Sequence, residues 1–138
     1  MNKLDLINKK GFTLIEIIAV LLIIGIISAV AAKKYLSLTN QARTLAAQDA
    51  IAEIKGRLSS AQSKYIMVNR GIAPTSPQLY TYATGNNAYR NAANLNNVGT
   101  DFNVRVTSGT PNITITVNRV LNVNLAPNVV GRFRAAGS

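Results

Sequence analysis

The residue types that could do chemistry are few in this chain. Its 138 residues include no cysteine and no histidine. Thiol chemistry, a disulfide framework and the usual zinc sites are therefore excluded, and the commonest general base is missing. The five acids show no paired-carboxylate site in the sequence: Asp5, Glu16, Asp49, Glu53 and Asp101. We predict that the protein is not an enzyme, with no catalytic residue, no metal site and no cofactor.

One of the acids, Glu16, is the single charge in an apolar run at residues 12–32. A helix of that length can cross a bilayer. A carboxylate at the bilayer centre costs roughly 2.5–3.5 kcal/mol on insertion scales. Glu16 lies only about 6 Å along a helix from Phe12, so its cost is smaller there. Two explanations stay open for this charge: it has a specific partner, or it reaches the lipid headgroups unpaired.

The residues around the start of this run form the most informative motif. Residues 9–16 read Lys-Lys-Gly-Phe-Thr-Leu-Ile-Glu and follow a short basic leader. Over about residues 8–32 the sequence resembles type IV prepilins, a family that includes the type II secretion pseudopilins. The resemblance implies that a prepilin peptidase cuts between Gly11 and Phe12 and methylates the new amine of Phe12. Gly11 suits this role because a residue without a side chain lets a protease approach the backbone.

The same resemblance gives Glu16 a role in assembly, together with Phe12. In a filament, the amine of Phe12 on one copy can pair with Glu16 of a neighbour, which cancels two poorly solvated charges. The implied partners are other copies in a helical homo-polymer, the prepilin peptidase and the inner-membrane assembly machinery. We expect the protein in the inner membrane before assembly and in an extracellular filament on the bacterial surface afterwards.

The chain divides into four expected segments: a cleaved basic leader (1–11), a transmembrane or filament-core helix (12–32), an amphipathic helix that continues it (33–70) and an exported globular β domain (71–138). Arg70 is expected in the last helical turn and Gly71 just beyond it as a cap. Many prepilins have a proline where this chain has Lys33 and Lys34, which leaves Gly25 as the weak point of the helix.

Two apolar faces follow the helical period of 3.6 residues in the predicted helix. The later face consists of Ile51, Ile54, Leu58, Ala61, Tyr65 and Val68. The earlier face points to nearly the opposite side and consists of Tyr35, Leu38, Ala42 and Leu45. We expect the later face to pack on the globular domain and the earlier face to contact neighbouring copies. The alternative is ordinary drift of a single face.

Strand-like alternation fills the last third of the chain. Three apolar rows are visible: Phe102, Val104 and Val106; Ile113, Ile115 and Val117; Leu121, Val123 and Leu125. We predict turns at 108–112 and at 118–119, an optional fourth strand at 128–133, and a mostly irregular segment at 72–100 with at most one short element. Three short strands need another apolar surface to form a stable core. The predicted fold is therefore α+β and pilin-like, with one long N-terminal helix packed on a small antiparallel sheet.

A rival interpretation of the N-terminal region is an ordinary secretory signal peptide. Ala29-Val30-Ala31 fits a small-residue cleavage site, and a cut there would release a secreted soluble basic protein. Within the prepilin interpretation, the sequence leaves open whether the product is a major pilin, a minor pilin or a secretion pseudopilin.

The charge of the chain raises one further hypothesis. The formal net charge is +10, and the exported segment is rich in arginine: Arg90, Arg105, Arg119, Arg132 and Arg134. Such a surface could bind the phosphates of DNA, and Tyr80, Tyr82 and Tyr89 could stack on bases. DNA is therefore an additional candidate partner, and ordinary solvation of scattered arginines is the alternative.

Overall fold

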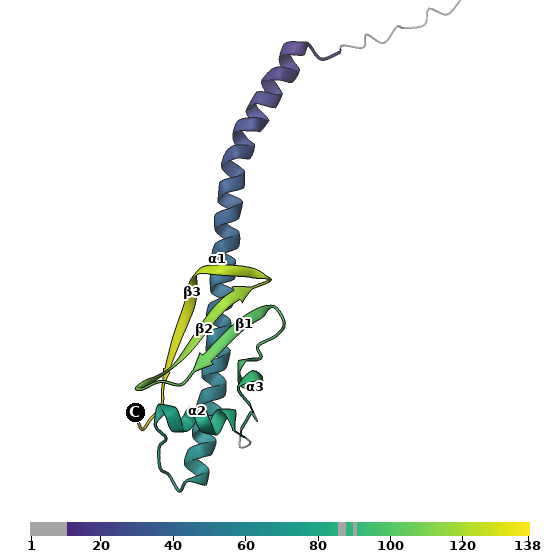
Figure 1. Cartoon of the computed structure of the whole chain (residues 1–138). Coiled ribbons are helices and arrows are strands. Elements are labelled where there is room, and N and C mark those ends of the chain that lie inside the picture. Colours follow the sequence, from purple (N-terminus) through teal and green to yellow (C-terminus); the bar gives the residue numbers. More distant parts are fainter. Residues whose placement is uncertain (1–10, 86–87, 90) are drawn as a thin grey trace, which may run out of the picture. The chain divides into compact units, whose positions relative to one another are not determined.

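The computed structural model describes residues 11–85, 88–89 and 91–138 (Figure 1). The predicted leader, apart from Gly11, and Arg90 lie outside the described residues. The described residues form two compact units, divided between Thr39 and Asn40. The elements in order are α1 (Leu14–Val68), α2 (Ser76–Thr84), α3 (Ala92–Asn96), β1 (Phe102–Thr107), β2 (Asn112–Val120) and β3 (Val123–Arg134).

Helix α1 confirms the long predicted helix, and its C-terminal end differs slightly from the prediction. The helix ends at Val68, and the backbone N–H of Gly71 donates to the carbonyl of Ile66 at 2.8 Å, which closes the end as in a Schellman motif. Arg70, expected in the last turn, lies beyond the helix in the left-handed region with φ of 55°. Gly71 also has a positive φ, of 91°.

The three strands form an antiparallel meander in the order β1-β2-β3, as predicted. The position of the second turn in the prediction is wrong. Strand β2 continues through residues 118–119, and the chain reverses at Leu121 and Asn122, whose φ values are 50° and 61°. Two positive φ angles in a two-residue loop match the twist of a hairpin. Residues 128–133 continue β3 and are not a fourth strand.

The pairing of β2 with β3 contains a large irregularity. Val117 pairs with Val129, but Arg119 pairs with Asn124, so residues 125–128 have no partner in the register of β2. Asn118 is likewise skipped in both ladders. The two halves of β3 are thus separated by a four-residue bulge.

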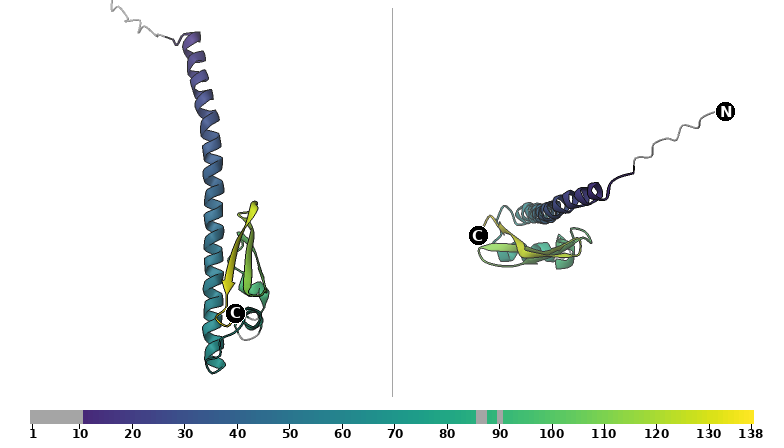
Figure 2. Two further views of the ribbon diagram at one scale, coloured as in Figure 1. Left: turned by 90° about the vertical axis from the view of Figure 1, so that its left-hand side faces the viewer. Right: turned by 90° about the horizontal axis from the view of Figure 1, so that it is seen from above.

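The core of residues 40–138 lies between the sheet, α2 and the second half of α1. The sheet forms one layer beside α1 (Figure 2), and Ile113, Ile115 and Val117 are fully buried. The predicted later face of α1 is confirmed at Ile51, Ile54, Leu58 and Ala61, which are all buried, and Tyr65 is half-buried. Val68 is 66% exposed, contrary to prediction, because the last turn of α1 extends beyond α2 and the strands (Figure 1).

Close approach between β3 and α1 depends on a glycine. A Cβ atom placed on Gly131 would collide with Cγ2 of Ile51. Both residues are buried. Gly131 therefore lets the backbone of β3 lie directly against the apolar face of α1.

Residues 72–100 are more ordered than predicted, since they contain the two helices α2 and α3. Helix α2 is preceded by Thr75, whose backbone N–H donates to Oε1 of Gln78 at 2.9 Å. A Thr followed three residues later by Gln is the sequence of a capping box, and this signal could have located the helix. Both helices contribute fully buried side chains to the core: Leu79, Ala83 and Leu95.

Candidate processing and assembly site

The predicted cleavage site lies in non-helical chain just before α1. Residues 11–13 are outside the helix, and all three are exposed. Apart from its chain neighbours, no heavy atom of the described residues lies within 4 Å of the position that a Cβ on Gly11 would take, and the side chain of Phe12 is 77% exposed. The bond between Gly11 and Phe12 is thus open to approach by a protease.

Glu16, the predicted assembly residue, lies in the first turn of α1. Its backbone N–H donates to Oγ1 of Thr13 at 3.3 Å, and the carbonyl of Thr13 accepts from the N–H groups of Glu16 and Ile17. Thr13 is therefore the N-cap of the helix, and Thr-x-x-Glu is the sequence of a capping box. Sequence reasoning missed Thr13, although this spacing was available to find it.

The position of Glu16 has an electrostatic consequence. The N-terminal end of a helix carries a partial positive charge, which stabilises a nearby carboxylate and destabilises a nearby cation. An amine created at Phe12 by cleavage would lie at this end of α1. Such an amine needs a compensating carboxylate, and Glu16 is the acid in the first turn.

The apolar surface that follows is exposed in the single chain. The large side chains from Leu14 to Val30 in α1 are between 46% and 81% exposed. This stretch is long and apolar enough to cross a membrane, and none of it is buried against the rest of the protein. Burying one such side chain is worth about 1.5–3 kcal/mol, so contact of this surface with water is unfavourable.

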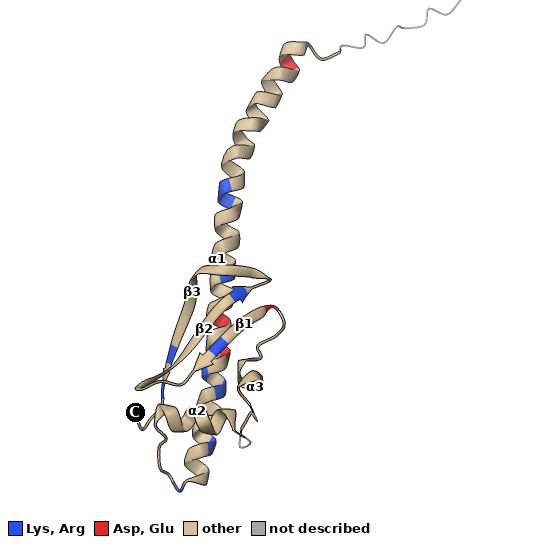
Figure 3. Cartoon of the chain, in the orientation of Figure 1, with Lys and Arg blue, Asp and Glu red and all other residues tan. Residues whose placement is uncertain are grey.

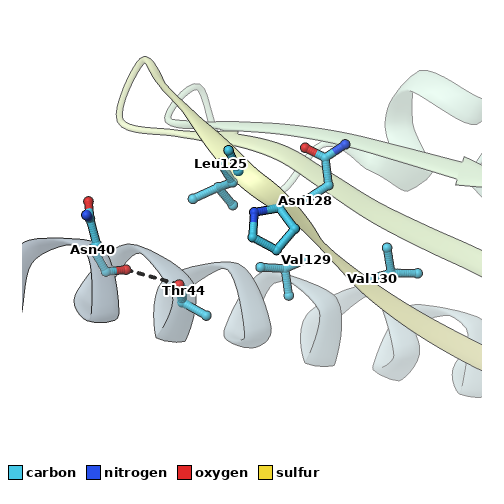
Figure 4. A pocket seen from close by; sticks show the side chains of 8 residues that line it. Asn40, Thr44, Leu125, Asn128, Val129 and Val130 are labelled. Atoms are coloured by element: carbon cyan, nitrogen blue, oxygen red, sulfur yellow. Dashed lines mark hydrogen bonds between the residues drawn. The ribbon is translucent and has the colours of Figure 1, made fainter. Parts of the chain in front are cut away.

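The described residues offer little other chemistry. They contain no group of three or more potential metal ligands. A cavity of about 490 Å³ lies between α1 and the bulge of β3, and Figure 4 shows Asn40 and Thr44 on one side and Leu125 and Asn128 on the other. The hydroxyl of Thr44 donates to the carbonyl of Asn40 at 3.0 Å. No titratable side chain lines this cavity.

Residues 6–32 match the protein family described as the prokaryotic N-terminal methylation motif. The chain carries the type IV prepilin signature. Comparisons with curated proteins and with solved structures give no match. The prepilin signature includes Gly11, Phe12 and Glu16, and it accounts for the string before the apolar run that an ordinary signal peptide leaves unexplained. The α+β layout of a long N-terminal helix and a small antiparallel sheet is pilin-like as well.

Proposed function

We propose that the chain is the precursor of a type IV pilin-like subunit, a structural protein and not an enzyme. The observation that carries this proposal is the prepilin signature at residues 6–32, at the beginning of a helix whose apolar side chains are exposed. The accessible backbone at Gly11 supports cleavage after this residue, and Phe12 then becomes the methylated N-terminal residue.

Before assembly the apolar stretch anchors the precursor in the inner membrane. A helix satisfies its own backbone hydrogen bonds, so it is stable in hydrocarbon. In the filament, helices of neighbouring copies replace the lipid. The earlier face of α1 supports contacts of this kind, because Tyr35, Leu38 and Leu45 are each more than 60% exposed.

The proposed register of the filament depends on two charges. The amine of Phe12 on one copy pairs with the carboxylate of Glu16 on its neighbour, where water is scarce and a charge-assisted hydrogen bond is strong. The partial positive charge at the N-terminal end of α1 destabilises the amine of Phe12, which makes a carboxylate partner more favourable. Removal of the carboxylate leaves the amine uncompensated and the axial position of the copies unspecified.

Mass spectrometry of sheared surface fibres tests the proposal. We expect a chain that begins at N-methylated Phe12 and includes the apolar stretch. A mature N-terminus at Ala32 or Lys33 would support the signal peptide instead. An abundant product in the fibres indicates a major pilin. A scarce product whose deletion blocks export of other proteins indicates a secretion pseudopilin.

The role of Glu16 has its own test. Glu16→Ala should leave cleavage after Gly11 intact and strongly reduce the yield of filaments. Asp49→Ala is the matched control, because Asp49 is another exposed acid of α1 and its loss changes the net charge equally. A normal filament yield from Glu16→Ala would refute the proposed register contact.

A further inference from the structure

The outer face of the sheet carries a concentrated positive charge. Residues of β1 and β2 with inward side chains form the core, and the residues between them point to the opposite face. On that face lie four exposed arginines, which we call the arginine face: Arg105 on β1, Arg119 on β2, and Arg132 and Arg134 on β3. The three strands contain no acid, and Figure 3 shows blue but no red along them.

The register of the strands brings Arg105, Arg132 and Arg134 together, and Arg119, which pairs with Asn103 and Asn124, lies toward the other end of β2. Arg105 pairs with Thr116, and Arg132 pairs with the next outward residue of β2, Thr114. Neighbouring strands are about 4.8 Å apart, and residues two apart in a strand are separated by about 7 Å. The Cα atoms of Arg105 and Arg132 are therefore roughly 12 Å apart, and those of Arg132 and Arg134 about 7 Å apart.

These charges are poorly compensated within the protein. Among the described residues, Arg105, Arg119 and Arg132 have no hydrogen-bond or ion-pair partner, and Arg134 donates from Nε to the carbonyl of Ser138 at 2.8 Å. Arg132 and Arg134, about 7 Å apart, lie within the Debye length of about 8 Å at physiological salt and repel each other, whereas salt largely screens the wider spacings on the face. A polyanion would remove this repulsion.

The side chains of the arginine face fit phosphate groups. An arginine fork can donate two parallel hydrogen bonds to one phosphate. Thr107, Thr114 and Thr116 add hydroxyl groups between the arginines on the same face. Contacts to nucleic-acid phosphates come mainly from these residue types.

The face lacks a platform for stacking on bases. The tyrosines predicted to stack, Tyr80, Tyr82 and Tyr89, are half-buried and pack against the core. The hydroxyl groups of Tyr80 and Tyr89 donate to backbone carbonyls, and the ring of Tyr82 contacts Tyr65 edge to face with centroids 5.2 Å apart. Single-strand binding relies on such stacking, so the face fits the backbone of a duplex better.

We propose that the arginine face binds the phosphate backbone of double-stranded DNA without reading its sequence. This activity goes beyond the proposed role as a filament subunit and requires neither cleavage nor polymerisation. Four neutralised phosphates predict that the logarithm of affinity falls with the logarithm of salt concentration with a slope of about −3.6.

The experiment measures binding of a short labelled DNA duplex to the full chain in a non-ionic detergent, over a range of salt concentrations. The test variant is Arg105→Gln/Arg119→Gln/Arg132→Gln. The matched control is Lys33→Gln/Lys34→Gln/Arg70→Gln, which removes the same charge from exposed positions outside the sheet. We expect the slope of the test variant to become less steep by about 2.7, with weaker binding at every salt concentration, and the control to change little.

Several results would overturn the proposal. No binding by the unchanged chain at low salt would end it, and so would an equal loss in the test and control variants, which would mean attraction by net charge alone. Tighter binding of a sulfated polysaccharide of equal charge, lost in the same test variant, would assign the face to polysaccharides. A variant with lysine in place of Arg105, Arg119 and Arg132 controls for misfolding. It keeps the positive charges, so its salt slope should match that of the unchanged chain, although it loses the paired hydrogen bonds of arginine.

Discussion

Two stretches of the same helix differ in what stabilises them. In residues 14–38 of α1 every side chain is exposed, although the stretch is apolar. In residues 40–68 the helix buries one face, from Ala47 to Ala61, against the sheet and α2. An amphipathic helix gains its stability from tertiary packing, whereas a uniformly apolar helix gains it from a non-aqueous surrounding. The two stretches of α1 thus depend on different surroundings: tertiary packing stabilises residues 40–68, and a non-aqueous environment suits residues 14–38.

The largest expected effect on the free energy of unfolding comes from replacing an isoleucine by alanine in the buried stretch of α1 and not in the exposed one. Ile54→Ala should lower the free energy of unfolding of residues 40–138 by about 2–5 kcal/mol, because Ile54 is fully buried and its truncation leaves a cavity. Ile24→Ala is the matched control, since Ile24 is 54% exposed. Urea unfolding of the full chain in detergent, followed by the near-ultraviolet circular dichroism of the tyrosines, measures both. Equal losses would contradict the division between the stretches.

Gly131→Ala should lower the same free energy by about 1–3 kcal/mol, because the new methyl group would overpack against Ile51. The cost should shrink when Ile51→Ala is present as well, since the colliding atom is then absent. Gly56→Ala serves as the control: nothing lies near its Cβ position, and an alanine in a helix raises stability by up to about 1 kcal/mol. An unchanged cost in the Ile51→Ala background would show that the contact is not the cause.

Ser76→Ala tests whether a buried polar cluster secures the globular unit. Ser76 is fully buried, and its Oγ donates to the carbonyl of Pro111 at 2.6 Å and accepts from the N–H of Ala135 at 3.2 Å. The substitution leaves buried polar groups unpaired, so thermal unfolding should reveal a loss of about 1–3 kcal/mol. Ser63→Ala, at an exposed position of α1, should change little. Comparable losses at both serines would mean that burial is irrelevant.

The smallest expected effect is a stabilisation at the end of α1. Arg70→Gly should raise the free energy of unfolding by about 1 kcal/mol, because a glycine adopts the left-handed conformation of this position without steric cost. The same change at Lys55, inside the helix, should lower it by about 1 kcal/mol. Urea midpoints of the two variants should therefore move in opposite directions, and a shift of the same sign in both would be inconsistent with the observed end of the helix.

Local patterns were enough to predict the long helix and most of its buried face, whereas the hairpin turn depended on distant residues and one helix with a local signal was missed. The spacing of Ile51, Ile54 and Leu58 is a property of the helix alone, and all three are buried as predicted. The hairpin turn was misplaced because Asn118 looks like a turn residue, yet the partner strands accommodate it as a bulge. Helix α2 was overlooked despite the local signal at Thr75 and Gln78.

The candidate site is local in sequence. The contiguous motif at residues 9–16 predicts Gly11, Phe12 and Glu16 as site residues. Their proposed roles involve only groups within this motif and the same motif on a neighbouring copy. Thr13 was missed as the cap of α1, although its hydrogen bond to Glu16 lies within one helical turn. Because this site is contiguous in sequence, tertiary structure adds exposure and capping geometry to it but no distant residue.

By itself the sequence determined the apolar stretch, the prepilin signature and the amphipathic face of α1, because each depends on residues within a few turns of one another. Only the tertiary structure decided that Gly131 meets Ile51 and that arginines of three strands share one outer face. Both outcomes depend on strand register, which is set by pairing between distant segments and shifted here by the bulges at Asn118 and at residues 125–128.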